Sequence, residues 1–344
     1  MKKSNLPLFG RLTASALAAM LSILPAMASA APQEIRIAVP DISVGSKPAG
    51  GGVADVLRAQ RLLEEEFAAD GIKIHWGFYK GAGPVINEAL ANGQVDFAYL
   101  GDLAAIVGKA NGLDTRLLSA ITRNGKVYLG TVPGSGITTL DDLKDKRVAI
   151  FRGTALQLSF ADALASQGLK ERDLKIINLD FSAASSALAA RQIDATWGFS
   201  NLIALRDRGL AELPLNSQDL DGAGSLQGVL VGDGRFVDAN PELLTRFLHA
   251  HLRAVEWLRD ERNKPAYLEL LAQQSGLPIK LLQADQGDND FHETFDPRLD
   301  AAFLQRLQQG VDLAASERLI RKGFNVQEWA AASRLPEVPA PLGQ

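Results

Sequence analysis

The chain has 344 residues, 22% of them charged, and a formal net charge of −4, so it is too acidic to favour general nucleic-acid binding. It has no cysteine, which excludes a cysteine nucleophile, a zinc–thiolate site and an iron–sulfur cluster. No segment after the N-terminal one reaches the length of about eighteen uninterrupted apolar residues that indicates a membrane-spanning helix.

The N-terminal segment has the pattern of a secretory signal peptide. A basic stretch that ends at Arg11 is followed by an apolar run over 12–24 and by the small-residue sequence Ala28-Ser29-Ala30. We therefore expect a signal peptide at 1–30 and a mature protein that begins near Ala31 in the periplasm. No cysteine follows the apolar run, so we expect no lipid anchor.

Removal of this segment would make the protein more acidic. It takes away the charges of Lys2, Lys3 and Arg11, which changes the net charge from −4 to −7. An overall field of this sign does not attract an anion, so any anion site must depend on local groups.

Strands and helices are predicted to alternate, which is typical of an α/β fold with parallel sheets. Predicted strands are 35–39, 72–79, 95–100, 117–121, 127–132, 147–151, 174–179, 193–197 and 227–231. Predicted helices are 53–69, 83–93, one after Asp102, 154–167 and 183–191, followed by a helical block from 240 to about 330.

The order of these elements predicts two α/β lobes joined by a hinge, with a cleft between them. Lobe 1 would comprise 31–125 and 223–334, including the C-terminal helices, and lobe 2 would comprise 126–222. Residues 335–344, with three prolines, are predicted to form a loose tail. Ligands of such sheets bind beyond the carboxyl ends of the strands, so the loops there hold the candidate site.

The segment Phe151-Arg152-Gly153-Thr154-Ala155 is the clearest candidate for an anion site. A strand ends and a helix begins there, so the first N–H groups of the helix have no partner within it and the helix dipole favours negative charge. Thr154 could add a hydroxyl donor. The simpler alternative is that Thr154 only caps the helix.

Other strand ends give weaker candidates. Gly101 would let a ligand approach the backbone, and Asp102 could pair with a ligand amine or cap the next helix. The Gly-rich loop over 41–52 lacks the spacing of a nucleotide-binding motif. Trp197 could cover the apolar part of a ligand or belong to the core, and Ser225 could donate to a ligand or occupy a turn.

Catalytic motifs are missing from the sequence. The chain has four histidines and no H-E-x-x-H pattern, and Ser135 is not part of a G-x-S-x-G motif. Asp288, Asp290 and Glu293 resemble a calcium loop only loosely, since the glycine at the sixth position is absent. We therefore expect no enzyme activity, no cofactor and no metal.

Five segments together resemble a known family. They are IRIAV (35–39), ALANGQVDFAYLGD (89–102), TLDDLKDKRVAIFRGTALQLSFADAL (139–164), AARQIDATWGF (189–199) and GSLQGVLVG (224–232). The chain resembles the periplasmic solute-binding proteins of ABC importers for aliphatic sulfonates, taurine and sulfate esters, which are related to those for nitrate and bicarbonate. The resemblance spans about residues 34–325.

This resemblance implies a periplasmic-binding-protein fold that captures a sulfonate or sulfate ester for sulfur acquisition. It implies an inner-membrane ABC permease as partner, and we expect a monomer. The residues that it places at the ligand are Asp41, Ser43, Gly101, Asp102, Thr154, Ala155, Trp197 and Ser225. A receptor for nitrate, bicarbonate, a polyamine or a heterocycle remains an alternative, as does a periplasmic hydrolase.

The chain departs from the family pattern at three places, one of which is a first loop that is longer and richer in glycine than usual. Thr154 is followed by Ala155 and Leu156 rather than by a run of serines, and Trp197 is followed by Gly-Phe-Ser-Asn rather than by an acidic or proline-bearing turn. These apolar replacements favour a bulkier organic tail. Enzymes that form the thiamin pyrimidine share the fold but carry a cysteine-rich motif, which this chain lacks.

Overall fold

The structure, a computed structural model, describes residues 1, 32–43 and 47–331. Apart from Met1, the predicted signal peptide (1–30) and the predicted tail (335–344) lie outside the described residues. No helix in the described part of the chain is long and apolar enough to cross a membrane.

The first sheet is built from strands that precede and follow those of the second sheet in the sequence. Ile35, Ile37 and Val39 are buried on β1, as expected for a β-branched central strand. Strands β2 and β3 run parallel to β1, whereas β10 runs antiparallel to β3 and β4. The strands, in spatial order, are β2 (Lys73–Tyr79), β1 (Glu34–Pro40), β3 (Phe97–Gly101), β10 (Leu226–Asp233) and β4 (Thr115–Gly125).

The second sheet contains only strands from the middle of the chain. Strand β6 is parallel to β7 and β8, and β5 is antiparallel to β8 and β9. The strands, in spatial order, are β7 (Lys175–Asn178), β6 (Arg147–Ile150), β8 (Ala195–Gly198), β5 (Tyr128–Thr131) and β9 (Glu212–Asn216).

Both sheets are therefore mixed, and the prediction of parallel sheets was wrong for β5 and β10. These two strands flank the crossings between the sheets. The chain passes from β4 to β5 and returns into β10. A strand that enters a sheet by such a crossing can pair antiparallel with its neighbours.

Helices cover both sheets. Those that follow strands of the first sheet are α1 (Gly52–Ala59), α2 (Leu62–Phe67), α3 (Ala82–Ala91), α4 (Asp102–Ala110) and α8 (Gly234–Ala239). Those of the second sheet are α5 (Ala155–Ser166), α6 (Phe181–Ala189) and α7 (Asn201–Asp207). Short 3₁₀ helices lie at Ala68–Asp70, Asp141–Leu143, Glu171–Asp173, Ser217–Leu220 and Glu261–Asn263.

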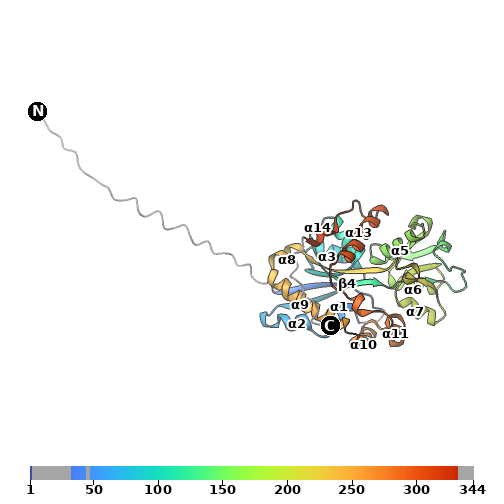
Figure 1. Ribbon diagram of the computed structural model, residues 1–344, viewed down its shortest axis with the longest axis horizontal. Helices are drawn as coiled ribbons and strands as arrows, with labels where there is room; N and C mark the ends of the chain where they lie inside the picture. Colours follow the sequence, from blue (N-terminus) through green and yellow to red (C-terminus); the bar gives the residue numbers. More distant parts are fainter. Residues whose placement is uncertain (2–31, 44–46, 332–344) are drawn as a thin grey trace. The chain divides into compact units, whose positions relative to one another are not determined.

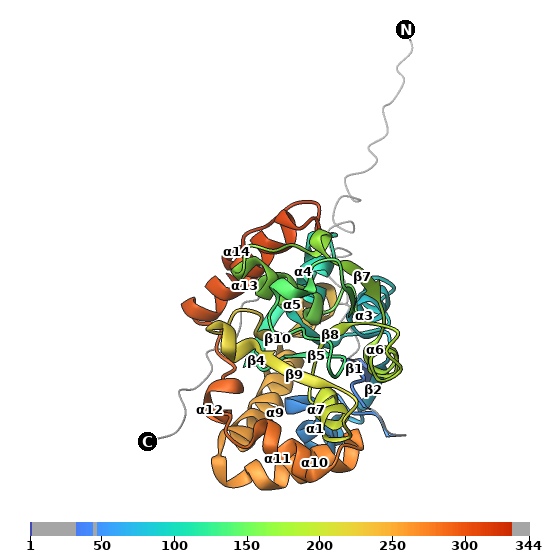
Figure 2. The same cartoon turned by 90° about the vertical axis from the view of Figure 1, so that its right-hand side faces the viewer.

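The C-terminal block is helical, as predicted. It consists of α9 (Pro241–Arg259), α10 (Lys264–Ser275), α11 (Ile279–Gln286), α12 (Phe291–Thr294), α13 (Ala301–Ser316) and α14 (Val326–Ala331). Helix α9 packs on α1 and α2, and α13 packs on α4 and α5 (Figures 1 and 2). The block thus contacts elements of both sheets.

One predicted helix is divided in the structure, and two observed elements were not predicted. The helix predicted over 53–69 is divided into α1 and α2, because Arg61 adopts the left-handed backbone conformation with φ of 54°. Helix α7 and strand β9 were not predicted, since their short apolar stretches carry little periodicity.

The two crossings between the sheets lie side by side. Leu226, at the start of β10, pairs with Gly125, at the end of β4. The side-chain amides of Asn124 and Gln227 bond here: Gln227 donates to Asn124 at 3.2 Å, and its own oxygen accepts from the Asn124 backbone N–H. This paired ribbon is where a hinge would act. The lobe boundaries near 125 and 223 remain a proposal.

Candidate ligand-binding site

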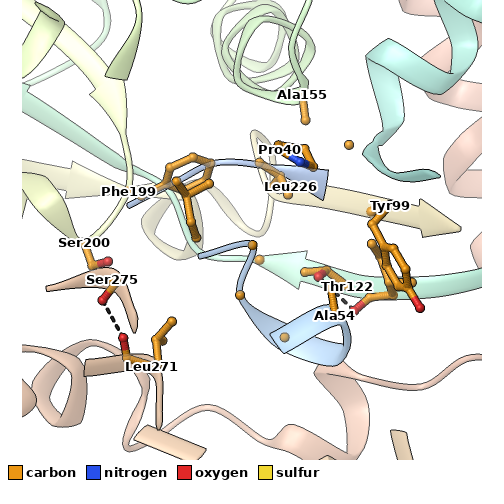
Figure 3. A pocket seen from close by; sticks show the side chains of 18 of the residues that line it. Pro40, Ala54, Tyr99, Thr122, Ala155, Phe199, Ser200, Leu226, Leu271 and Ser275 are labelled. Carbon is orange, nitrogen blue, oxygen red and sulfur yellow. Dashed lines mark hydrogen bonds between the residues drawn. The ribbon is translucent and has the colours of Figure 1, made fainter. Parts of the chain in front are cut away.

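A cavity of about 300 Å³ lies where the connections of the two sheets meet. It is bordered by the carboxyl ends of β1 and β3, by β4 and β10, and by residues of α10, α11 and α12 (Figure 3). The first residues of α1, α3, α5, α6 and α7 also line it. A cavity at the carboxyl ends of strands is the expected ligand position in an α/β fold.

The start of α5 offers backbone donors to this cavity. Ala155 and Leu156 line it, and no acceptor for their backbone N–H groups is recorded among the described residues. In the preceding loop, the N–H of Gly153 donates to Gln157, and that of Arg152 donates to Asn178. The free groups at the positive end of a twelve-residue helix suit an anion.

Four of the eight residues predicted to touch a ligand line the cavity: Ser43, Gly101, Thr154 and Ala155. The Thr154 hydroxyl donates to the carbonyl oxygen of Phe151 at 2.7 Å, so its proton is used inside the loop. The donors that remain at this helix start are therefore backbone N–H groups. The part that these four residues play in binding stays a prediction.

Asp41 and Asp102 do not line the cavity. The Asp41 carboxylate accepts from the backbone N–H groups of Ser43 and Ala49 and so holds the glycine-rich loop. The Asp102 carboxylate accepts from the N–H of Leu103 at 2.7 Å. Burial raises the pKa of Asp102 to about 7.

Trp197 and Ser225 are also buried away from the cavity lining. Trp197 belongs to the core of the second sheet, beside Phe160 at a ring-centroid distance of 5.9 Å. Its indole N–H donates to Ser159 at 2.7 Å. Ser225 lies in the turn before β10, where its N–H donates to the Gly222 carbonyl oxygen. In this structure Trp197 packs in the core and Ser225 lies in a turn, which are the two alternatives to a ligand contact given above.

Connections of the two sheets pack closely together beside the cavity. A Cβ atom on Gly101, at the end of β3, would lie 2.4 Å from the Cβ of Ala155. A Cβ on Gly153 would lie 2.9 Å from the Pro84 ring. Such distances leave no room for a side chain, so these glycines permit close contact between the second sheet's α5 loop and the first sheet's β3 and α3.

Sequence reasoning missed most of the apolar lining. Phe181 and Phe199 come from the second sheet, and Tyr267 and Phe295 come from the C-terminal block. Ser182 and Ser200 also line the cavity, and no hydrogen-bond partner of either hydroxyl is recorded among the described residues. The sequence Gly-Phe-Ser-Asn after Trp197 was the one available signal for Phe199 and Ser200.

A buried hydrogen-bond network near the site joins Tyr99, His251 and Ser119. His251 contacts the Tyr99 hydroxyl at 3.0 Å through Nδ1 and the Ser119 hydroxyl at 3.1 Å through Nε2. Burial lowers the pKa of His251 to about 3, and the side chains of His251 and Ser119 are buried and do not line the cavity. This network therefore supplies hydrogen-bond partners to polar side chains of the core. The described residues contain no cluster of three metal-ligating side chains.

The family model described as NMT1/THI5 like matches residues 67–265. This chain belongs to the NMT1/THI5-like family. The match spans β2 to the start of α10 and thus includes the whole second sheet and both crossings.

Named relatives of this NMT1/THI5-like chain include two aliphatic sulfonates-binding proteins. The one from Escherichia coli K12 is 28% identical over 91% of this chain and 94% of its own length. The one from Bacillus subtilis 168 is 27% identical over 62% of this chain, which spans 64% of that relative.

A solved structure of a sulfonate-binding protein is also similar to this chain. The alkanesulfonate-binding protein SsuA from Xanthomonas axonopodis pv. citri, bound to MOPS, is 26% identical, with a TM-score of 0.72. The alignment covers 87% of this chain and 98% of that one. The periplasmic-binding-protein fold predicted from the sequence is thereby confirmed.

Proposed function

We propose that this chain is the periplasmic binding component of an ABC importer and captures an organic sulfonate or a sulfate ester for sulfur acquisition. The observation that carries the proposal is the cavity of about 300 Å³ at the start of α5, where the backbone N–H groups of Ala155 and Leu156 lack acceptors among the described residues. The sulfonate-binding relatives support the ligand class.

The anionic head lies at the backbone N–H groups of Ala155 and Leu156. A sulfonate presents three oxygens that accept hydrogen bonds, and the helix dipole favours its charge in spite of the acidic net charge of the protein. The hydroxyls of Ser182 and Ser200 are further donors on the second sheet's side of the cavity. Gly101 lets β3 approach the same helix start.

A smaller inorganic anion fits the cavity less well. Nitrate or bicarbonate would occupy a small part of a space of about 300 Å³, and the apolar side chains that line the rest would stay in contact with water. An organic anion covers those side chains, so the cavity favours it over nitrate and bicarbonate.

The proposal assigns no catalysis, because catalysis would need a positioned nucleophile, base or metal at the cavity. The Ser119–His251 pair is buried and does not line it. Turnover of a chromogenic sulfate ester by the purified protein, abolished by a chelator, would instead support a hydrolase.

Ligand-induced stabilisation of the purified mature chain tests the ligand class. The panel contains alkane- and arylsulfonates, sulfate esters, taurine, nitrate and bicarbonate. A ligand present at about 100 times its Kd should add about 2.7 kcal/mol to the free energy of unfolding. Stabilisation by a heterocycle or by nitrate, with none by any sulfonate or sulfate ester, would refute the proposal.

Location is tested separately. The resemblance and the predicted signal peptide support a periplasmic location, where the protein would deliver its ligand to an inner-membrane permease. Cell fractionation should find a mature form that begins near Ala31 in the periplasmic fraction. Retention of the full-length chain in the cytoplasm would contradict this placement.

A further inference from the structure

Two groups of aromatic rings border the cavity. On the second sheet, Phe181 contacts Phe151 edge-on at a centroid distance of 5.1 Å and contacts Phe199 at 5.6 Å. We call Phe151, Phe181 and Phe199 the α6 aromatic cluster. Phe181 and Phe199 line the cavity (Figure 3 labels Phe199).

The second group belongs to the C-terminal block. Tyr267, Phe291 and Phe295 contact one another with centroid distances of 5.2–6.0 Å and nearly perpendicular rings, and we call them the α12 aromatic cluster. Tyr267 and Phe295 line the cavity. The Tyr267 hydroxyl accepts from the Gly52 N–H at 2.8 Å, which fixes the ring at the start of α1.

The two clusters differ in burial. Tyr267 and Phe295 are 3% and 5% exposed, whereas Phe181 and Phe199 are only partly buried. Covering apolar surface that is open to a cavity lowers the free energy by about 25 cal/mol per Å². Phe181 and Phe199 therefore offer ring surface that a ligand can cover.

The charged side chains at the cavity are hydrogen-bonded to neutral groups of the protein. Lys126 and Asp285 are the charged side chains among the described lining residues. Lys126 Nζ donates to the Asp285 carbonyl oxygen at 3.2 Å, and the Tyr128 hydroxyl donates to the Asp285 carboxylate at 2.5 Å. The Asp285 carboxylate is 7% exposed and already accepts a hydrogen bond, so it is poorly placed to receive a ligand ammonium. A cationic tail would therefore lose its hydration with little compensation.

We propose that the ligand carries an uncharged aromatic tail of one or two rings, which packs against Phe181 and Phe199. This inference rests on the proposed function, in which the sulfonate head occupies the start of α5. Aromatic pairs gain free energy beyond the area that they bury, when their rings stack with an offset or meet edge-on. A cavity of about 300 Å³ is at the lower end of the sizes of small-molecule pockets, which suits one or two rings.

Isothermal titration of the mature chain with a series of sulfonates tests the tail. The series is taurine, ethanesulfonate, cyclohexanesulfonate, benzenesulfonate and 2-naphthalenesulfonate. We expect 2-naphthalenesulfonate to bind at least about tenfold more tightly than ethanesulfonate, because more apolar surface is covered. We expect benzenesulfonate to bind more tightly than cyclohexanesulfonate, and taurine to bind most weakly.

A variant pair assigns the effect to the ring of Phe199. F199L keeps an apolar side chain. It should weaken the affinity for 2-naphthalenesulfonate by about fivefold while changing the affinity for ethanesulfonate by less than about twofold. F236L is the matched control: Phe236 is also partly buried in an aromatic pair but does not line the cavity. It should leave both affinities unchanged. Thermal unfolding of each variant checks that it is folded.

The outcomes separate the two proposals. If no sulfonate or sulfate ester binds, the proposed function fails. If sulfonates bind but ethanesulfonate or taurine binds as tightly as the arylsulfonates, the aromatic tail is refuted and the proposed function stands. If cyclohexanesulfonate matches benzenesulfonate on the wild type and F199L affects all sulfonates equally, the tail is apolar without being aromatic, which also refutes this inference.

Discussion

The indole N–H of Trp197 donates a hydrogen bond of 2.7 Å to the hydroxyl of Ser159, which in turn donates to the carbonyl oxygen of Gly224. Gly224 lies at the crossing that returns the chain to the first sheet. It has a φ of 77°, and a Cβ there would lie 3.0 Å from the Trp197 ring. Trp197 is thus linked through Ser159 to the connection between the sheets.

Loss of the Ser159 hydroxyl should lower the free energy of unfolding. S159A leaves the buried indole N–H and the Gly224 carbonyl oxygen without this partner, and we expect a loss of about 1–3 kcal/mol in the free energy of unfolding. S166A, on the same helix but at an exposed position, should change it by less than about 0.5 kcal/mol. Chemical denaturation of both variants measures the difference, and equal values would contradict this role.

The contact between Gly101 and Ala155 should limit how closely the two sheets approach. The Gly101 backbone, with φ of −70° and ψ of 155°, accepts alanine without strain, but the added Cβ would meet that of Ala155. If the lobes close by a hinge, G101A should weaken ligand binding by at least about tenfold, because overpacking costs about 1–3 kcal/mol.

The double variant G101A/A155G supplies the control, since it removes the opposing methyl group. Titration with 2-naphthalenesulfonate should show that A155G restores most of the affinity lost in G101A. A double variant that binds as weakly as G101A would show that the pair is not in contact in the ligand-bound state.

The buried carboxyl of Asp102 should make stability depend on pH. Burial raises its pKa from 3.8 to about 7, with Asp162 acting in the same direction and Arg306 acting against it. The folded state therefore binds the proton more tightly than the unfolded state. Stability from this group is fully present below about pH 4, is lost as pH rises to about 7, and is then constant.

Comparison with D102N isolates this contribution, because asparagine has no titratable proton. Between about pH 4 and 7, the free energy of unfolding of the wild type should fall relative to that of D102N, by at most about 1.4 kcal/mol per pH unit. Chemical denaturation at several pH values checks the slope. Parallel profiles for the two proteins would contradict the raised pKa.

The Tyr128–Asp285 hydrogen bond joins β5 of the second sheet to α11 of the C-terminal block. Burial raises the pKa of Asp285, and Y128F would remove a donor from this buried carboxyl. We expect a loss of about 1–3 kcal/mol in the free energy of unfolding. Y79F is the control: no hydrogen bond of the Tyr79 hydroxyl is recorded among the described residues, and the change should stay within about 0.5 kcal/mol. Denaturation curves that coincide for the two variants would refute the link.

The sequence predicted those parts of the site that lie at strand ends followed by a glycine and a helix. Gly101 and Ala155 line the cavity because such junctions face the carboxyl edge of a sheet. The same reasoning could not place Trp197, since an aromatic side chain at a strand end turns toward either the cleft or the core, and the Ser159 hydroxyl that binds it lies 38 positions away.

The C-terminal contribution to the cavity was beyond prediction for a different reason. Tyr267 lies on α10 and Phe295 directly follows α12, and neither sequence has a pattern that marks these residues as cavity lining. They reach the cavity through packing against α1 and β4, far away in the sequence, and local patterns do not encode such contacts.

A crystal structure of the mature chain with 2-naphthalenesulfonate tests the central claim most directly. The account predicts that the sulfonate oxygens lie within hydrogen-bond distance of the Ala155 and Leu156 backbone nitrogens, with the rings against Phe181 and Phe199. A ligand bound outside the cavity, or one whose sulfonate lies away from the start of α5, would contradict it.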